Sequence, residues 1–138
     1  MPKFGRSSRE ILATVDEDLQ RLFKEVVIGF DCKPTCGLRT SDEQASLYAI
    51  GRTVNVGQPT VTTLDGVDKK SRHQSGRAID ICPYPINWND IHRFYFFAGY
   101  VKATAERLGI GIRWGGDWDG DTDLSDNSFN DLPHFELT

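Results

Sequence analysis

The stretch Ser71–Cys82, SRHQSGRAIDIC, decides how this chain folds and where its chemistry lies. Its second part, Ala78–Cys82, has the period-two alternation of a half-buried strand. That alternation predicts that Asp80 lies on one face of a sheet while the isoleucines on either side of it point into the core. His73 precedes the strand in a loop, so we expect an imidazole and a carboxylate on the same surface.

A second stretch, Asp131–Leu137 (DLPHFEL), supplies matching side chains near the end of the sequence. We expect its last four residues to form a strand with His134 and Glu136 on one face. Two strands would then bring Asp80 and His134 together, with His73 arriving from its loop. Two imidazoles and one carboxylate leave the fourth position of a tetrahedral zinc open for water, which is typical of a catalytic site.

A zinc hydrolase also needs a base and a group that stabilises the oxyanion. Asp131, three residues before His134, is the candidate base for a metal-activated water. Arg39 is the candidate cation, because it lies just before a predicted helix from which Gln44 could support it. The alternatives without a function are that Asp131 is a loop acid and that Arg39 forms a surface ion pair.

Three further side chains have weaker claims than these, and His92 is expected to be a structural or surface histidine. Ser71 is either a loop serine or a donor beside the metal ligands. Glu136 is either a partner of His134 or a solvated acid. Trp118 is either part of the core or part of a substrate groove.

Composition limits the class of protein. The 138 residues suffice for one domain, 1–138, with one core, and no repeat or linker divides them. The formal net charge of −4 argues against nucleic acid as a partner. No apolar run approaches the roughly 20 residues needed to cross a bilayer, so we expect no stable membrane insertion, and we expect a monomer. The N-terminal run lacks the apolar stretch of a secretory signal, so synthesis in a cytoplasm is expected.

The three cysteines do not form a zinc-finger pattern, because no second pair completes Cys32 and Cys36. Reduced structural thiols are the favoured interpretation for these two and for Cys82. A disulfide between Cys32 and Cys36 after export stays open.

Helical periodicity is clear in two places in the first half of the chain. Apolar residues of Val15–Val27 recur at helical spacing, with Asp16 as the expected N-cap and Gly29 as the end. A shorter helix is expected at Asp42–Ile50, capped by one residue of the Thr40–Ser41 pair.

The remaining elements complete a small mixed domain. Thr53–Lys70 is expected to be a long loop or loose hairpin. A helix is expected at Trp88–Leu108, capped by Asn87 and ended by Gly109, and a strand at Ile110–Trp114. Together these elements predict an α+β fold, with helices packed on one face of a small, mainly antiparallel sheet.

The acidic run Asp117–Asp123 (DWDGDTD) has oxygen-bearing side chains at alternate positions, like the start of an EF-hand loop. It lacks the flanking helix, and the twelfth position, which would hold a bidentate glutamate, is Ser128. A solvated acidic loop is therefore favoured over a second site for a hard cation such as Ca²⁺.

The two motifs resemble those of a known family. They read SxHxxGxAxD at residues 71–80 and DxxHxEL at residues 131–137. This pair resembles peptidase family M15, the group of zinc D-Ala-D-Ala peptidases and phage endolysins, and within it endolysins of the L-alanyl-D-glutamate endopeptidase type. Similar segments at residues 3–5, 12–15, 37–40, 88–90 and 116–118 extend the resemblance over nearly the whole chain.

The resemblance implies a Hedgehog/D-Ala-D-Ala-peptidase-like fold with one zinc ion held by His73, Asp80 and His134. It implies that Asp131 is the catalytic base and that Arg39 lies near the substrate or transition-state carbonyl. The implied substrate is the stem peptide of bacterial peptidoglycan, cut between L-Ala and D-Glu.

Related activities remain as alternatives. One is a D,D-carboxypeptidase or D,D-dipeptidase of the same family, and a weaker one is a non-catalytic cell-wall-binding module. The resemblance further implies a bacteriophage enzyme of host cell lysis and antimicrobial action. It would accumulate in the host cytoplasm and reach the cell wall in the periplasm after holin-type release.

Overall fold

A four-stranded antiparallel sheet lies at the centre of the structure, a computed structural model that describes residues 1–138. The strand order is β1-β2-β4-β3, so β2 and β4 are the inner strands. The strands are β1 (Cys32–Cys36), β2 (Ala78–Pro83), β3 (Ile112–Gly115) and β4 (Asp131–Leu137). The inner pair carries both predicted ligand-bearing stretches.

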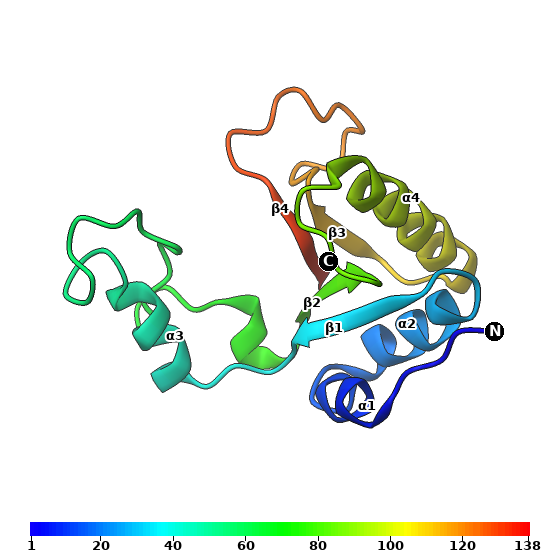
Figure 1. Ribbon diagram of the computed structural model, residues 1–138, viewed down its shortest axis with the longest axis horizontal. Coiled ribbons are helices and arrows are strands. Elements are labelled where there is room, and N and C mark those ends of the chain that lie inside the picture. Colours follow the sequence, from blue (N-terminus) through cyan, green and yellow to red (C-terminus); the bar gives the residue numbers. More distant parts are fainter.

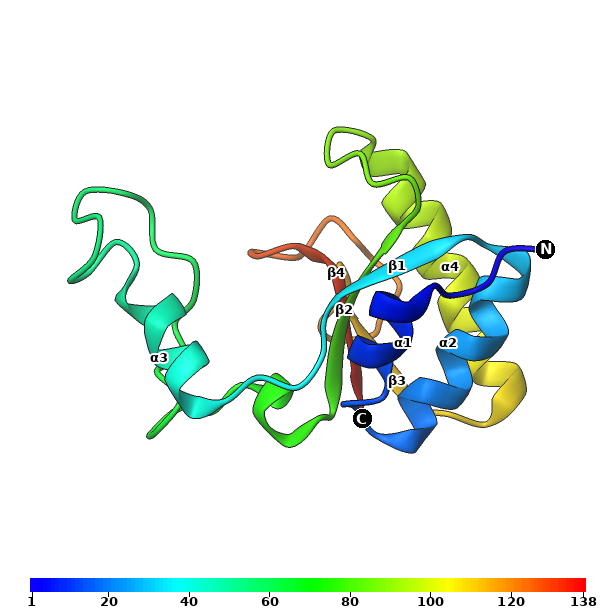
Figure 2. The ribbon, with the colours of Figure 1, turned by 60° about the horizontal axis from the view of Figure 1, so that its bottom comes forward.

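Three helices cover one face of this sheet, and the rest of the helical structure lies on the other side (Figures 1 and 2). The covering helices are α1 (Arg6–Leu12), α2 (Glu17–Gly29) and α4 (Ile91–Leu108). Helix α3 (Ser41–Ala49) and the short 3-10 helix η1 (Arg72–Ser75) stand apart from them, joined by the loop of residues 50–71. The predicted α+β architecture is therefore confirmed.

The core lies between the sheet and α2 and α4. Ile79, Phe23, Phe97 and Phe135 are all fully buried. Phe135 on β4 packs edge-on against Phe23 and Phe97, with ring centroids 5.6 and 6.0 Å apart. The isoleucines of β2 face this core, which leaves the alternate positions of the strand for the opposite surface.

Local capping explains two of the predicted helices. The Asp16 side chain accepts a hydrogen bond from the backbone N–H of Asp18 and caps α2 as expected. Thr40 caps α3 in a complete capping box with Glu43, which decides between Thr40 and Ser41. Gly29 is the last residue of α2 rather than the residue after it.

The prediction for α4 was wrong at its start. The helix begins at Ile91 with Asp90 as its N-cap, not at Trp88 with Asn87 as its cap. The Asn87 side chain instead accepts from the N–H of Asn89 in a preceding turn. Gly109 ends the helix in the left-handed conformation, at φ 71°, as predicted.

Strand boundaries also differ from prediction. β4 begins at Asp131 instead of His134, because the chain continues to pair with β3 through a register shift at Gly115. β3 starts at Ile112, two residues later than expected. Asp131 therefore lies on a strand and is not a loop residue.

Three short elements were not predicted. β1 contains Pro34, which argues against a strand in the sequence, but β1 is an edge strand and an edge strand tolerates proline. α1 and η1 span only seven and four residues, too short to show a periodic apolar stripe. Residues 53–70 form an irregular loop, as expected, with only an isolated bridge between Ile50 and Val54. None of the helices combines the length and apolarity that a membrane crossing requires.

Neighbouring phenylalanines on α4 test the assignment of its buried face. Phe97 is fully buried and Phe96 is 69% exposed. We expect Phe97→Ala to lower the free energy of unfolding by about 3–5 kcal/mol. Phe96→Ala, the matched control, should cost about 1 kcal/mol or less. Urea denaturation of both variants measures the difference, and equal losses would contradict this orientation of α4.

Candidate active site

Three side chains from separate segments converge on the sheet face opposite α1, α2 and α4. Asp80 on β2 and His134 on β4 are direct partners in the antiparallel register. His73 comes from η1, immediately before β2. Oδ1 of Asp80 lies 3.2 Å from Nε2 of His73 and 3.3 Å from Nδ1 of His134. The two strands and the short helix thus place all three predicted ligands together.

The surroundings of each imidazole leave one nitrogen free to point at Asp80. Nδ1 of His73 lies 3.0 Å from the carbonyl oxygen of Gly37 and donates its proton there. Nε2 of His134 lies 2.9 Å from Oε1 of Glu136. Such contacts to the far ring nitrogen fix the tautomer and orientation of metal-binding histidines. The remaining nitrogens, Nε2 of His73 and Nδ1 of His134, face the shared carboxylate.

The donor set fits a divalent metal ion. Oδ1 of Asp80 is buried, and its neighbours are the two ring nitrogens at 3.2 and 3.3 Å, which lie at ion-pair distance but outside hydrogen-bond geometry. A buried carboxylate needs charged partners of this kind or a metal ion. The possible metal ligands form two groups that share Asp80, one with Cys36 and His73 and one with Asp131 and His134, and within each group the ligand atoms lie within 4.8 Å of one another. Nitrogen and oxygen ligands suit zinc.

The same geometry perturbs the protonation of the metal-free site. Burial acts to lower the pKa of His73, but the Asp80 carboxylate and the Cys36 sulfur outweigh it and raise the pKa. For His134, burial is likewise outweighed by Asp80 and Glu136, so its pKa is also raised. Burial acts to raise the pKa of Asp80, but the two histidines hold it well below its usual range.

Asp131 occupies the edge of this cluster. Its Oδ2 lies 3.8 Å from Nδ1 of His134, and its side chain is 36% exposed. Burial and the charge of Asp80 raise the pKa of Asp131 above its ordinary value. A raised pKa moves the carboxyl toward the range in which a general base both accepts and returns a proton.

Gly115 lets the Asp131 backbone approach. The two residues pair across β3 and β4 beside the register shift. A Cβ on Gly115 would collide with the backbone carbonyl of Asp131. Only glycine therefore fits opposite Asp131 without moving it.

Glu136 lies on the same face of β4 as His134, as expected. It is 5% exposed, and besides His134 its carboxylate contacts Arg72 at 3.2 Å and Arg113 at 3.4 Å. Burial acts to raise the pKa of Glu136, but His134 and these cations lower it. The carboxylate is therefore a buried partner of His134 and not a solvated acid.

Arg39 enters the site from the segment before α3. Its guanidinium donates to Oε1 of Gln44 at 2.7 Å and to Sγ of Cys36 at 3.3 Å. Gln44 is fully buried, and its amide donates to the carbonyl oxygen of Leu64. Gln44 thus joins Arg39 to the long loop, as its predicted supporting role requires.

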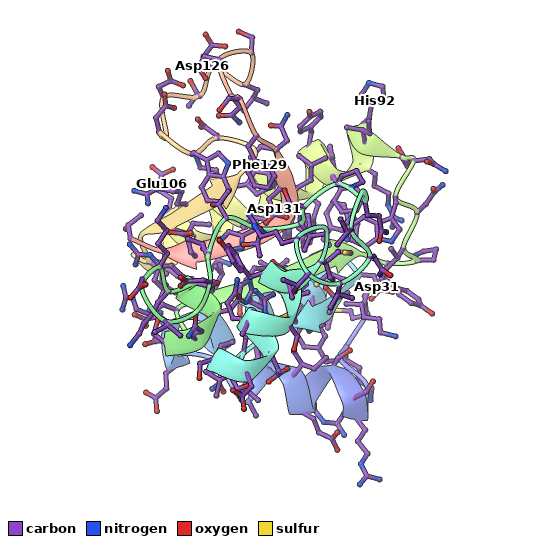
Figure 3. The ribbon with its side chains drawn as sticks, turned by 90° about the vertical axis from the view of Figure 1, so that its left-hand side faces the viewer. Asp31, His92, Glu106, Asp126, Phe129 and Asp131 are labelled. Carbon is purple, nitrogen blue, oxygen red and sulfur yellow. The ribbon has the colours of Figure 1, made fainter.

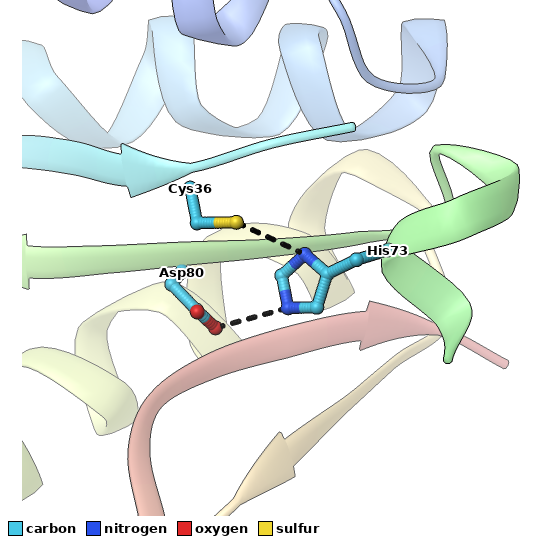
Figure 4. A group of neighbouring side chains, drawn as sticks. All are labelled: Cys36, His73 and Asp80. Atoms are coloured by element: carbon cyan, nitrogen blue, oxygen red, sulfur yellow. Dashed lines mark hydrogen bonds and ion pairs between the residues drawn. The ribbon is translucent and has the colours of Figure 1, made fainter. Parts of the chain in front are cut away.

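Cys36 was not anticipated at the site. Its Sγ lies 3.9 Å from Nδ1 of His73, and this sulfur, a His73 ring nitrogen and an Asp80 carboxylate oxygen lie within 4.8 Å of one another (Figure 4). Cys32, Cys36 and Cys82 are all free thiols in this structure. The spacing of the cysteines does not predict a thiol beside His73.

Ser71 supports the site through the backbone. Its hydroxyl accepts from the N–H of His73 and caps η1, and its own N–H donates to Oε1 of Gln74. This capping box fixes the turn that presents His73. Ser71 therefore holds a ligand-bearing turn and is not an idle loop serine.

A cleft of about 720 Å³ opens over the three ligands. One wall is the Thr60–Leu64 segment of the long loop, and the other carries Trp118 and Phe129. The two rings stack at 6.3 Å between centroids, and Trp118 also lies 5.4 Å from the His134 ring. Figure 3 shows Phe129 and Asp131 near the middle of this face, with His92 at its margin. Phe129 lies in a polar loop with no periodic pattern, so no sequence motif predicts its place in the cleft.

The acidic loop has one unusual member. Asp117 is 2% exposed, its Oδ2 accepts from the N–H of Thr122, and its Oδ1 is buried without a partner. Asp119 and Asp121 are exposed, and one carboxylate oxygen from each of the three residues lies within 4.8 Å of the others. The favoured interpretation was a solvated acidic loop. The structure differs from it at Asp117, which is buried.

The sequence is similar to that of known peptidases. The sequence matches the family described as phage L-alanyl-D-glutamate peptidase over residues 1–138. It is 33% identical over 129 residues to the L-alanyl-D-glutamate peptidase of Escherichia phage T5, covering 90% of this chain and 87% of that protein.

Solved structures show the same fold. The L-Ala D-Glu endopeptidase ChiX of Serratia marcescens superposes with a TM-score of 0.71 at 26% identity, covering 98% of this chain and 89% of that one. The vancomycin resistance D,D-pentapeptidase VanY, solved in complex with Zn(II), gives 0.53 at 19% identity, covering 88% and 68%. The second likeness concerns the fold alone.

Metal uptake should release protons. Both histidine pKa values are raised above the ordinary value of about 6.5, so the metal-free imidazoles carry protons at neutral pH. A metal ion must displace these protons. The apparent affinity for the metal should therefore weaken as the pH falls, and it should strengthen as the pH rises until both raised pKa values are passed. Titration calorimetry with zinc, in buffers of different ionisation enthalpy, should show at least about one proton released per ion at pH 7. His92→Ala is the control and should behave as wild type, and proton-neutral binding would contradict the assignment.

Proposed function

The chain belongs to the phage L-alanyl-D-glutamate peptidase family, and we propose that it is a zinc-dependent peptidoglycan hydrolase that cleaves the L-Ala–D-Glu bond of the stem peptide. The observation that carries the proposal is the buried carboxylate of Asp80, which two oriented ring nitrogens approach to 3.2 and 3.3 Å inside a cleft. Asp131 stands beside them with a carboxylate that makes no side-chain hydrogen bond.

His73, Asp80 and His134 would hold the zinc ion. When bound there, zinc supplies Lewis acidity, which activates water and polarises a carbonyl oxygen. The protein keeps the two ring nitrogens available through the Gly37 carbonyl and the Glu136 carboxylate. These contacts would preserve the orientation of the ligands during turnover.

Asp131 is proposed to move the proton. Its carboxylate accepts a proton from the attacking water and returns it to the departing amine nitrogen of D-Glu. Its raised pKa suits both halves of this transfer. Its place on β4, opposite Gly115, holds it at a fixed distance from His134.

Arg39 is proposed to donate to the carbonyl oxygen of the scissile amide as negative charge develops there. Gln44 and Cys36 occupy two of its five N–H donors and leave the others for substrate. Trp118 is proposed to line the cleft for the apolar part of the peptide, together with Phe129.

The alternatives differ in the bond that is cut. A D,D-carboxypeptidase or D,D-dipeptidase would use the same residues on terminal D-Ala. A non-catalytic cell-wall-binding module is disfavoured, because a binder has no use for a carboxylate base beside an open metal position. We further propose a monomer that is made in the host cytoplasm, does not bind nucleic acid and reaches the periplasm through holin-type release.

We also propose that Asp117, Asp119 and Asp121 take one hard cation such as Ca²⁺. The unpartnered, buried Oδ1 of Asp117 supports this, since oxygen clusters are the ligands that such ions prefer. Calcium titration of the zinc-loaded protein should show one site that Asp119→Asn weakens and that the control Lys3→Met leaves unchanged. Absence of calcium binding to the wild type would remove this proposal.

Digestion of Gram-negative sacculi, read by mass spectrometry, tests the activity. We expect cleavage between L-Ala and D-Glu that a chelator abolishes and added zinc restores. Release of terminal D-Ala alone would favour the carboxypeptidase, and no cleavage after zinc is restored would favour the binding module.

Substitution of the base separates chemistry from metal binding. Asp131→Asn should retain zinc while kcat falls by about 10²–10⁴, the usual cost of removing a general base. His73→Ala should lose zinc and activity together. Asp42→Asn makes the same chemical change at an exposed position and should leave the rate unchanged. A fully active Asp131→Asn enzyme would contradict the assignment.

A further inference from the structure

A second hollow is adjacent to the cleft over the proposed metal ligands. That hollow has a volume of about 900 Å³ and lies beside η1 and the start of α3. Four residues, Arg39, Lys70, Ser71 and Arg72, line both the cleft and the hollow. Three of the four carry positive charge, in a chain whose net charge is −4.

The three cations that line both hollows differ in their contacts. Arg72 is engaged by the Glu136 carboxylate at 3.2 Å. Arg39 is held by Gln44 and Cys36 and, in the proposed function, serves the scissile carbonyl. Lys70 takes part in none of the ion pairs of the structure and in none of its side-chain hydrogen bonds, although it lines both hollows. It is the one of these three cations that is left for a substrate.

The backbone at Lys70 is well fixed. The next residue, Ser71, is locked by the capping box with Gln74 that also positions His73. Gln74 donates in turn to the carbonyl oxygen of Gly66, which ties down the end of the long loop. The backbone of Lys70 is therefore held in place three residues before His73, a proposed metal ligand. Its ammonium group is carried on a flexible four-carbon side chain.

The substrate offers a matching charge. A glutamate residue has two carboxyl groups, and at most one of them forms the amide bond to the rest of the stem. In an L-Ala–D-Glu substrate the other stays a free carboxylate, on the amine side of the scissile bond. Resting on the proposed function, we propose that Lys70 binds this free carboxylate and so makes the enzyme selective for glutamate over its amidated form.

The test compares two peptides that differ only at this group. One is an L-Ala–D-Glu peptide extended through one glutamate carboxyl, and the other has the remaining carboxylate converted to an amide. At low salt the wild type should favour the acid by about three- to tenfold in kcat/KM, as expected for a partly exposed ion pair, and high salt should reduce this ratio. Lys70→Met should bring the ratio close to one, mainly through KM with the acid, and Lys70→Arg should restore it.

Lys69→Met is the matched control. Lys69 is the adjacent exposed lysine and lines neither hollow, so this variant should keep the wild-type preference. An unchanged preference in Lys70→Met would overturn the role of Lys70 while leaving the proposed function intact. A wild-type enzyme that cleaves neither peptide, with zinc present, would overturn both.

Discussion

The register of β2 against β4 is the constraint on which the site depends. It sets Asp80 opposite His134 and, on the alternate positions, Ile79 opposite Phe135. A slip of one residue would turn the imidazole and the carboxylate into the apolar core and expose the buried isoleucine and phenylalanine. Burial of Phe135 against Phe23 and Phe97 therefore specifies the position of the polar ligands on the other face. Core packing and the proposed metal site are two consequences of one alternation.

Much of this arrangement could be predicted from the sequence because it rests on strong local patterns. The alternation of Ala78–Cys82 and the capping residues Asp16 and Thr40 act within a few residues of themselves. The errors fall where tertiary contacts decide instead. β4 extends back to Asp131 only because β3 pairs with it, and an edge position makes room for the proline of β1.

The surroundings of the ligands were harder to foresee than the ligands themselves. Cys36 contacts His73 across a sequence separation of 37 residues. Phe129 reaches the cleft by stacking on Trp118, and Gln44, whose support of Arg39 was predicted, also donates to the carbonyl oxygen of Leu64 in the long loop. These are contacts between segments, and no spacing within one segment encodes them. Sequence patterns indicate which residues do the chemistry, whereas the fold decides what holds them in place.

The site contains three carboxylates, and each of them lies in a different environment. Asp80 is buried between two imidazoles, which stabilise its charge and lower its pKa. Glu136 is buried against His134 and two arginines, so its charge is already compensated. Asp131 has only a longer contact to His134, at 3.8 Å, and burial and the charge of Asp80 raise its pKa. Neighbouring carboxylates acquire different roles when their environments separate their pKa values. The partners around each acid therefore suit it to its proposed role as ligand, support or base.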